Sequence, residues 1–379
     1  MSHFTRRILL LVVAIVLVAG DANAQIVFGS PPVARARIVY QSWTVDNDIT
    51  GDKFDVSQWY FPVYGFVPIA EDWEIHVSSA TAGTQSDSSG SDVSINGLND
   101  TRISVLHSLF DDRLLLGAGL NIPTGKATLE LDQSGLGQVL TTDFLNFPAK
   151  NYGEGFGLYL ESAYARQTGK LTLGVGAGYL LSSSYSPIRG SDSYDPGDKF
   201  VAGGNLGVSH DFGNAYAYLR YSSFGNSTQD GIDVYKIGSI TEVAFGTTFI
   251  YEQFESDAGV RLLFRQADSR TVSGELLEFE HKNYGNDLRI FTALGYRLRK
   301  AGKASVLIDY KSISANGFES GDDEYAGKAN IFGFGAGFEK SVTDEVDLSA
   351  SFKSFSGSAD DGNLDLSGLE IGLAVRVSL

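Results

Sequence analysis

The chain has 379 residues, no cysteine and a formal net charge of −17 at pH 7. The lack of cysteine excludes disulfides, thiolate metal sites and cysteine catalysis, and the negative charge argues against nucleic acid as a partner, because phosphate binding needs a basic surface. A content of 44 Gly with only 8 Pro argues against collagen and against a disordered linker. The 24 Phe and 18 Tyr favour β-strands.

The first 24 residues have the pattern of a secretory signal peptide. Arg6 and Arg7 precede an apolar run over 8–20, and Ala22-Asn23-Ala24 follows it. The run is shorter than the roughly 20 residues that cross a bilayer as a helix. We therefore predict cleavage near Ala24 rather than an uncleaved anchor helix, with 25–379 as one exported domain. No later apolar run is long enough for a membrane-spanning helix.

Apolar residues alternate with small or charged residues along much of the chain. In the last eleven residues, 369–379, Leu369, Ile371 and Leu373 alternate with Glu370, Gly372 and Ala374. A period of two residues predicts β-strands. We expect about sixteen of them, at 35–45, 54–68, 73–83, 99–110, 113–122, 153–166, 170–183, 199–210, 215–225, 236–251, 257–267, 286–299, 303–313, 328–340, 345–355 and 367–379.

The connections between these strands alternate in length. Short turns such as 111–112 and 211–214 alternate with long polar loops such as 84–97, 186–198 and 269–285. This pattern predicts an all-β fold, a closed antiparallel up-and-down transmembrane β-barrel of about 16 strands, because closure removes exposed strand edges. Fourteen or eighteen strands are the alternatives, since boundaries taken from one sequence are soft.

The two faces of the strands differ in a way that distinguishes lipid from water. One face is apolar, and the other combines glycine, alanine and serine with charge, which is the inverted pattern of an outer-membrane barrel. A large soluble secreted β-protein is the alternative. We therefore expect the bacterial outer membrane as the location, with both chain ends in the periplasm and the acidic loops outside. The expected partners are outer-membrane lipids, lipopolysaccharide, the outer-membrane assembly machinery and a small-molecule solute, with the oligomeric state open.

The longest connection, 123–152, carries an amphipathic stretch. A short helix is predicted from about 134 to 146, capped by Asp132 or Ser134 and ended by Pro148. Its apolar side is formed by Leu136, Val139, Leu140, Phe144 and Leu145. The segment either enters the barrel and narrows the pore or lies over the mouth as a cap.

Charged residues recur on the face that we expect to line the lumen. The basic candidates are Arg220, Arg261, Arg265, Arg289, Arg297 and Arg376, and the acidic candidates are Glu161, Glu242, Asp309, Asp347 and Glu370. Opposed rows of charge would create a transverse field that selects solutes. The alternative is a lattice of salt bridges that stiffens the wall. Arg220 follows Tyr216 and Tyr218 and either stacks on an aromatic ring or packs against the wall.

Aromatic residues near the expected strand ends suit the membrane interfaces. They are Trp43, Trp59, Tyr60, Trp73, Tyr164, Tyr179, Tyr221, Tyr251 and Tyr310. The glycine-rich stretches 174–179 and 333–338 are explained by a lumen face, so no cofactor is predicted. The acidic loops lack the spacing of a calcium loop, and no metal site is predicted.

One stretch resembles a known family. Residues 97–129, GLNDTRISVLHSLFDDRLLLGAGLNIPTGKATL, combine Gly-Leu-x-Asp, two strands joined by a tight turn, and Asn-Ile-Pro-Thr-Gly. They resemble outer-membrane proteins of the MetA pathway of phenol degradation, relatives of FadL-type transporters. The resemblance implies a barrel that moves small apolar or aromatic molecules. The chain departs from it in lacking room for an N-terminal hatch and in ending on Leu379 rather than an aromatic residue.

These patterns predict a pore or facilitator for the passive passage of small molecules, which the resemblance implies are hydrophobic or aromatic, without enzymatic activity. A structural or adhesive barrel with a closed lumen is the main alternative. A membrane-embedded hydrolase is less favoured, because no Ser/His/Asp spacing stands out around His76, His107, Ser78 or Ser79.

Overall fold

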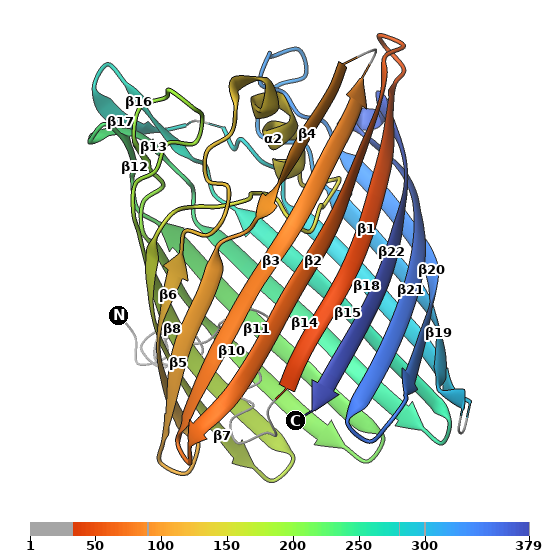
Figure 1. Ribbon diagram of the computed structural model, residues 1–379. Coiled ribbons are helices and arrows are strands. Elements are labelled where there is room, and N and C mark those ends of the chain that lie inside the picture. Colours follow the sequence, from red (N-terminus) through yellow and green to blue (C-terminus); the bar gives the residue numbers. More distant parts are fainter. Residues whose placement is uncertain (1–32, 89–90, 280, 299–300, 379) are drawn as a thin grey trace, which may run out of the picture.

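The computed structural model describes residues 33–88, 91–279, 281–298 and 301–378, and the predicted signal peptide and Leu379 lie outside them. Sixteen strands form the barrel (Figure 1). They are β1 (Val33–Asn47), β2 (Lys53–Ala70), β3 (Trp73–Ser88), β5 (Thr101–Leu109), β6 (Leu114–Ile122), β7 (Gly157–Thr168), β8 (Leu171–Ser182), β10 (Lys199–His210), β11 (Gly213–Phe224), β14 (Ile240–Tyr251), β15 (Phe254–Arg265), β18 (Asp287–Arg297), β19 (Lys303–Ile313), β20 (Ala329–Ser341), β21 (Val346–Ala359) and β22 (Leu364–Ser378).

The barrel closes between its first and last strands. β1 pairs with β22 in antiparallel register from Val33 opposite Ser378 to Asn47 opposite Leu364. Every other barrel strand pairs antiparallel with the barrel strands before and after it in the sequence. Closure gives each strand backbone a partner on both sides, which hydrocarbon requires because it offers no hydrogen bonds. The prediction of a closed antiparallel barrel of about sixteen strands is confirmed.

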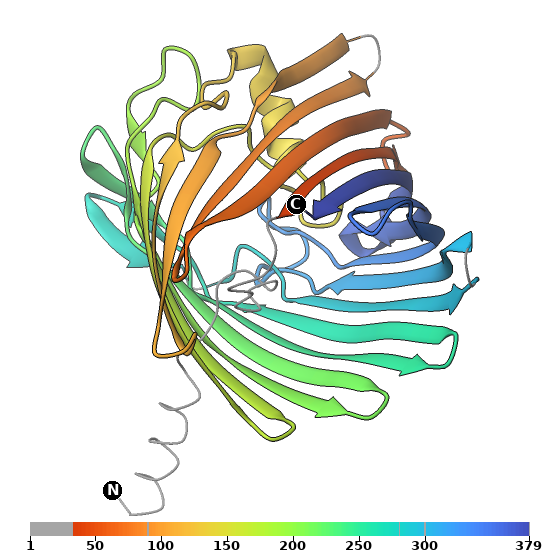
Figure 2. The same ribbon diagram turned by 60° about the horizontal axis from the view of Figure 1, so that its bottom comes forward.

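The short turns lie at one end of the barrel and the long loops at the other (Figures 1 and 2). β1 begins and β22 ends at the short-turn end, so the described chain enters and leaves on the same side. The outward face is apolar: Phe245 and Leu373 each expose 54% of their surface. The intervening residues face the interior, where Glu242 and Asp309 are buried.

The prediction of 84–97 as a loop is wrong. β3 continues to Ser88, and its upper half, Thr81–Ser88, pairs with β4 (Ser91–Leu98), while its lower half pairs with β5. The strand ladder therefore rises above the rest of the barrel on this side (Figure 1). The run of Ser, Asp and Gly at 84–97 hides these strands, because neither face is apolar enough to show a period of two.

The long loops at 186–198, 225–233 and 269–285 also contain strands that the sequence pattern does not reveal. They form a separate five-stranded sheet beyond the barrel wall (Figure 1). Its strands are β9 (Tyr194–Asp195), β12 (Ser227–Gln229), β13 (Ile232–Lys236), β16 (Ser269–Val272) and β17 (Glu275–Glu278). Strands of two to five residues are too short to establish a periodic pattern.

The helical elements include the 3-10 helices η1 (Leu131–Gln133) and η3 (Asp360–Gly362) and the α-helix α2 (Ser134–Thr141). Among the described residues, no helix is long and apolar enough to cross a membrane.

Candidate functional site: the lumen and the segment that enters it

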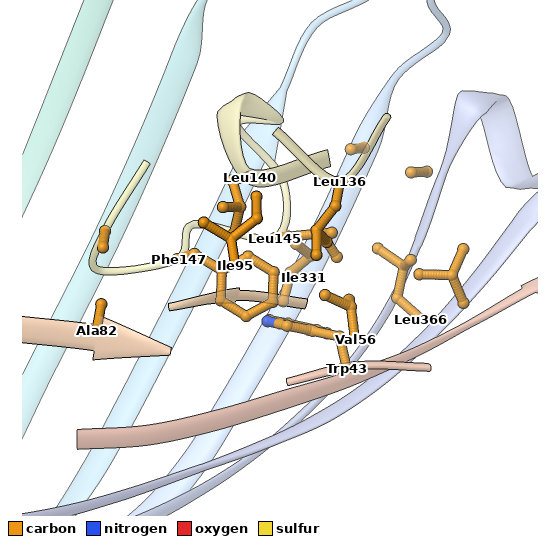
Figure 3. Close-up of a cluster of buried hydrophobic side chains, with 14 of the residues drawn as sticks. Trp43, Val56, Ala82, Ile95, Leu136, Leu140, Leu145, Phe147, Ile331 and Leu366 are labelled. Atoms are coloured by element: carbon orange, nitrogen blue, oxygen red, sulfur yellow. The ribbon is translucent and has the colours of Figure 1, made fainter. Parts of the chain in front are cut away.

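The connection 123–152 between β6 and β7 packs against the inside of the barrel wall. Leu136 and Leu140 of α2, with Leu145 and Phe147 beyond it, are buried, and Val139 and Phe144 pack on the same cluster. Their neighbours are inward-facing side chains of the wall (Figure 3), among them Trp43, Val45, Val56, Ile95, Ile331 and Leu366. The five apolar residues singled out from the sequence are thus brought together, on the inner face of the long-loop end.

Two buried glutamines of the wall fix the backbone of this segment. The Gln41 side-chain amide on β1 donates to the carbonyl of Leu145 at 2.8 Å. Gln58 on β2 donates to the carbonyl of Ala149 and accepts from the Ala149 N–H, both at 2.8 Å. A buried backbone group left unpaired costs about 1–3 kcal/mol. These two side-chain amides therefore help to fix where the non-helical part of the segment lies along the inner face of the wall.

Asp143 connects the segment to strands far from β1 and β2 around the barrel. Its carboxylate lies 2.7 Å from Arg265 on β15 and 2.8 Å from Lys150 of the same segment. Its backbone carbonyl accepts a hydrogen bond from Lys311 on β19. Burial favours the neutral acid, but the hydrogen bond from Lys150 and the three nearby cations outweigh it and hold the pKa of Asp143 below its ordinary value. The segment therefore extends across the lumen at its long-loop end (the upper lumen), where the ionised Asp143 binds cations of β15 and β19 (the Asp143 bridge).

Asp100, between β4 and β5, holds both ends of the segment. Its carboxylate accepts from the backbone N–H of Gly125 at 2.9 Å and of Glu154 at 2.7 Å. A third donor is the side-chain amide of Asn121, at 3.0 Å. Gly125 lies so close to the Tyr152 carbonyl and to Asp100 that a Cβ would collide with both. The aspartate of Gly-Leu-x-Asp and the asparagine and glycine of Asn-Ile-Pro-Thr-Gly therefore form one structural unit, the Asp100 clamp.

The predicted caps and end of the helix are wrong. The N-terminal turn is closed by a capping box between Glu130 and Gln133 at the start of η1, not by Asp132 or Ser134. α2 ends at Thr141 rather than near 146, because Thr142 turns into extended backbone (φ −61°, ψ 131°). The chain then needs an extended path to bring Leu145 and Phe147 onto the wall, and Pro148 has no helix to end.

The charged residues of the lumen are paired between neighbouring strands instead of standing in opposed rows. Glu242 on β14 is 2% exposed and binds Arg220 on β11 and Arg261 on β15, the latter at 2.6 Å. It also accepts a hydrogen bond from Tyr218. A carboxylate this buried requires such partners, because removing one member of a buried pair costs about 3–5 kcal/mol. These contacts have the geometry of the salt-bridge lattice.

A second group of charges surrounds Asp309. Arg289 forms a two-bond ion pair with its carboxylate, and Lys353 lies 3.7 Å away. Arg297 and Lys303 share Glu255, each at 3.1 Å.

The other predicted candidates are more dispersed. Glu370 faces Arg37 at 3.5 Å. Asp347 accepts from the Ser341 hydroxyl at 2.6 Å and stands opposite Arg376 in the strand register. Glu161 lies over Gly117, opposite it on β6.

Glycine on the inner face makes room for large side chains on the next strand. Tyr216 lies against Gly246, its register partner, so closely that a Cβ on the glycine would collide with the ring. Phe291 lies over Gly259 in the same way, Phe355 over Gly333 and Trp43 over Gly368. Rings that lie along the wall occupy less of the cross-section than rings that stand away from it. The high glycine content therefore helps to keep space in the lumen.

The sequence prediction placed nine aromatic residues at the membrane interfaces, and two of these placements are wrong. Trp43 is 2% exposed and stacks on Phe355 inside the barrel, at 5.2 Å between ring centroids. Tyr60 shares the inward face of β2 with Gln58. Exposed positions are occupied by others of the set, including Trp59, Trp73, Tyr164, Tyr179, Tyr221 and Tyr251.

The histidines considered for hydrolysis have other partners. The two ring nitrogens of His76 contact Tyr64 at 2.8 Å and Glu74 at 3.0 Å. His107 stacks on Trp73 with 4.2 Å between centroids, and its Nδ1 lies 3.1 Å from the Asp72 carbonyl. In the part of the chain that the structure describes, no cluster of three or more His, Asp or Glu has a geometry that would hold a metal ion.

Several residues of this site were not predicted, including Asp100, Asp143, Lys150 and Lys311. Asp100 belongs to the quoted motif, but nothing in the sequence shows that its carboxylate binds the other part of that motif. Asp143 carries a weaker signal: it is the one charge within the apolar stretch 139–147.

The fold and these contacts define a closed barrel with an apolar exterior, a charged and glycine-rich interior, and one connection docked inside. Solved barrels align along nearly the whole chain. A FadL homologue of Pseudomonas aeruginosa covers 92% of this chain and 90% of its own, at 13% identity and a TM-score of 0.44. OccK7 (OpdD) of the same organism covers 92% and 99%, at 10% identity and a TM-score of 0.46, and its OpdQ covers 91% and 98%, at 9% and 0.45.

These likenesses are too distant to assign a family or a solute. No family model and no curated protein matches the chain. The resemblance to the MetA-pathway proteins therefore stays a prediction that depends on residues 97–129.

Proposed function

We propose that this protein is a bacterial outer-membrane pore for the passive passage of small molecules. The observation that supports this function best is the inversion of the barrel: apolar side chains cover the exterior, while ion pairs and glycines occupy the interior. A charge on the lipid face costs about 2–4 kcal/mol at mid-membrane, and an apolar exterior with this interior is what a lipid-embedded, water-filled barrel requires.

The lumen wall formed by β6, β7, β8 and β10 suits solutes with an apolar or aromatic surface, the class that the family resemblance implies. Its inward positions are rich in small residues, including Gly117, Gly119, Ala163, Ala165, Gly174, Gly176, Gly178 and Gly203. A flat solute would meet little obstruction on this side. The charged wall of β14 to β19 follows it around the barrel, separated from β10 by β11.

A closed structural barrel is the second candidate, and the docking of 123–152 across the upper lumen favours it. The two functions differ in conductance. We expect purified protein in planar bilayers to give ion current, and to give more when residues 127–151 are replaced by a short glycine linker. The replacement is feasible because Gly125 and Glu154 lie on the same Asp100 carboxylate.

The controls decide between the candidates. Both proteins should migrate differently on gels with and without boiling, as closed barrels do. Current in the shortened protein but none in the intact protein would favour the closed barrel. Silence of both correctly folded proteins at high protein loading would refute the pore.

A further inference from the structure

The barrel wall holds two cations in place independently of the inserted segment. Arg265 donates through one guanidinium nitrogen to the carbonyl of Gly285 at 2.6 Å. Lys311 lies 3.3 Å from the carboxylate of Asp287. Neither partner belongs to the segment 123–152, so both cations keep an orienting contact when the segment is displaced.

Asp143 of the segment accepts further hydrogen bonds from both of these cations. Its carboxylate binds the second terminal nitrogen of Arg265, and its backbone carbonyl accepts from Lys311. The Arg265 and Lys311 side chains are only 14% and 12% exposed. If Asp143 left, Arg265 would lose its carboxylate partner and Lys311 would keep Asp287, so the two cations would offer free donors to an anion.

The flanking residues restrict how far Asp143 can move. Leu140 and Leu145 are almost completely buried in the apolar cluster with Trp43 and Ile331, and the Asp100 clamp holds both ends of the segment. Release of Asp143 therefore frees only the turn 141–143 while the rest stays docked. This turn carries the polar contacts of Asp143 with Arg265 on β15 and Lys311 on β19.

We propose that Asp143 is an internal substitute for the carboxylate of a transported solute, and that a small carboxylate opens the upper lumen by taking its place on Arg265 and Lys311. This inference depends on the proposed pore function. The chemistry of the present occupant specifies the class of ligand, because a guanidinium recognises carboxylates with geometry that a simple ion such as chloride lacks. Tyr284, whose ring centre lies 5.9 Å from the Arg265 guanidinium carbon, provides a surface for the body of the solute.

The competition sets the concentration at which the solute acts. An internal ligand on a short tether has an effective concentration of about a millimolar or more. A solute of similar intrinsic affinity must therefore reach roughly millimolar levels to displace Asp143. At low solute concentration Asp143 stays bound to Arg265 and Lys311.

The test is current through planar bilayers while acetate replaces chloride at constant ionic strength, with acetamide as a neutral control. Each current is divided by that of the shortened barrel lacking 127–151 under the same conditions, which removes the difference in ion mobility. For the intact protein we expect this normalised current to rise with acetate in the millimolar range and to stay constant with acetamide. For D143N we expect a raised current without acetate and no further rise with it.

A second variant and a matched control complete the test. R265Q removes the wall cation and should also lose the acetate response. D46N removes a carboxylate from the ion pair with Lys53, 3.6 Å apart outside the segment, and should behave like the unaltered protein. An unresponsive intact protein, or an equal acetate response in D143N, overturns the inference. If the shortened barrel itself carries no current, the pore function fails instead.

Discussion

The Asp100 clamp predicts that one substitution detaches the inserted segment while leaving the barrel closed. In D100A, the N–H groups of Gly125 and Glu154 and the amide of Asn121 all lose their acceptor. A hydrogen bond to a charged group contributes about 1.5–3 kcal/mol, but Asp100 is half-buried, and water replaces part of what is lost. We expect the free energy of opening the segment to fall by about 2–4 kcal/mol.

Limited proteolysis measures this opening. Lys150 follows the buried Ala149 and precedes β7, so trypsin reaches this bond when the segment leaves the wall. If opening is fast relative to cleavage, the rate follows the open population, and about 2–4 kcal/mol corresponds to roughly 30- to 1,000-fold faster cleavage. The product is identified by mass, since exposed loops contain other tryptic sites.

Two controls separate the clamp from general damage. The D100A barrel should keep its shift between boiled and unboiled samples, because the strand ladder does not depend on Asp100. D198A removes an acceptor of similar type, which binds the Tyr179 hydroxyl and the Ser182 N–H in another loop, and should leave cleavage after Lys150 unchanged. Equal cleavage of D100A and the unaltered protein, with both barrels intact, would refute the assignment of Asp100 as the clamp.

Two further predictions concern the lumen. G246V should lower conductance, because the new side chain pushes the Tyr216 ring off the wall into the passage, and Y216A in the same chain should restore it; unchanged single-channel current in G246V would contradict the proposed use of glycine. Asp143 faces Lys150, Arg265 and Lys311, with Asp287 beside Lys311 and Tyr284 beside Arg265, and its pKa is lowered from 3.8. The ionised carboxylate of Asp143 therefore stabilises the docked segment fully above about pH 4, and this stabilisation is lost as the pH falls through the lowered pKa of the folded protein. In a carboxylate-free buffer, the accessibility of the segment to trypsin or pepsin should be constant from pH 5 to 8 and rise only below about pH 4. A transition between pH 5 and 7 would show that another group controls docking.

The barrel strands could be predicted because they are long and exposed to two different environments. Strands of nine or more residues repeat the alternation several times, and a lipid face tolerates few exceptions. β4 lies beside a run rich in Ser, Asp and Gly, and the strands of the five-stranded outer sheet are only a few residues long. Their pairing depends on neighbouring loops, which no periodicity within one segment records.

The assignment of faces failed where the interior itself becomes apolar. Trp43, Val45 and Val56 face inward yet are hydrophobic, because the inserted segment covers them with Leu136, Leu140 and Leu145. The rule that apolar residues face lipid assumes a wet interior, and it fails at the long-loop end. The docked segment 123–152 shields these inward apolar side chains from water, so the inward position of Trp43 follows only from that docking.

In the candidate site, the alternation of side chains along a strand indicates which charged residues face inward, but it does not show which of them form ion pairs with one another. Arg261 and Glu242 meet because β14 and β15 pair with Ala244 opposite Arg261, a register that depends on the turn between the strands. The contacts of Asp143 are even harder to predict, because its partners Arg265 and Lys311 belong to strands more than 120 residues later in the chain. Only the three-dimensional path of the segment brings them together.

The wall and the inserted segment are stabilised by different interactions, and this separation matters for a pore. The wall is held by a continuous ring of backbone hydrogen bonds, which are insensitive to side-chain identity and strong where water is absent. The segment is held by one apolar cluster, the Asp100 clamp and the Asp143 bridge, each of which a single substitution removes. Loss of the bridge therefore changes how wide the lumen is without opening the barrel. A pore built this way can alter its selectivity through residues 123–152 while the strands that keep it in the membrane stay the same.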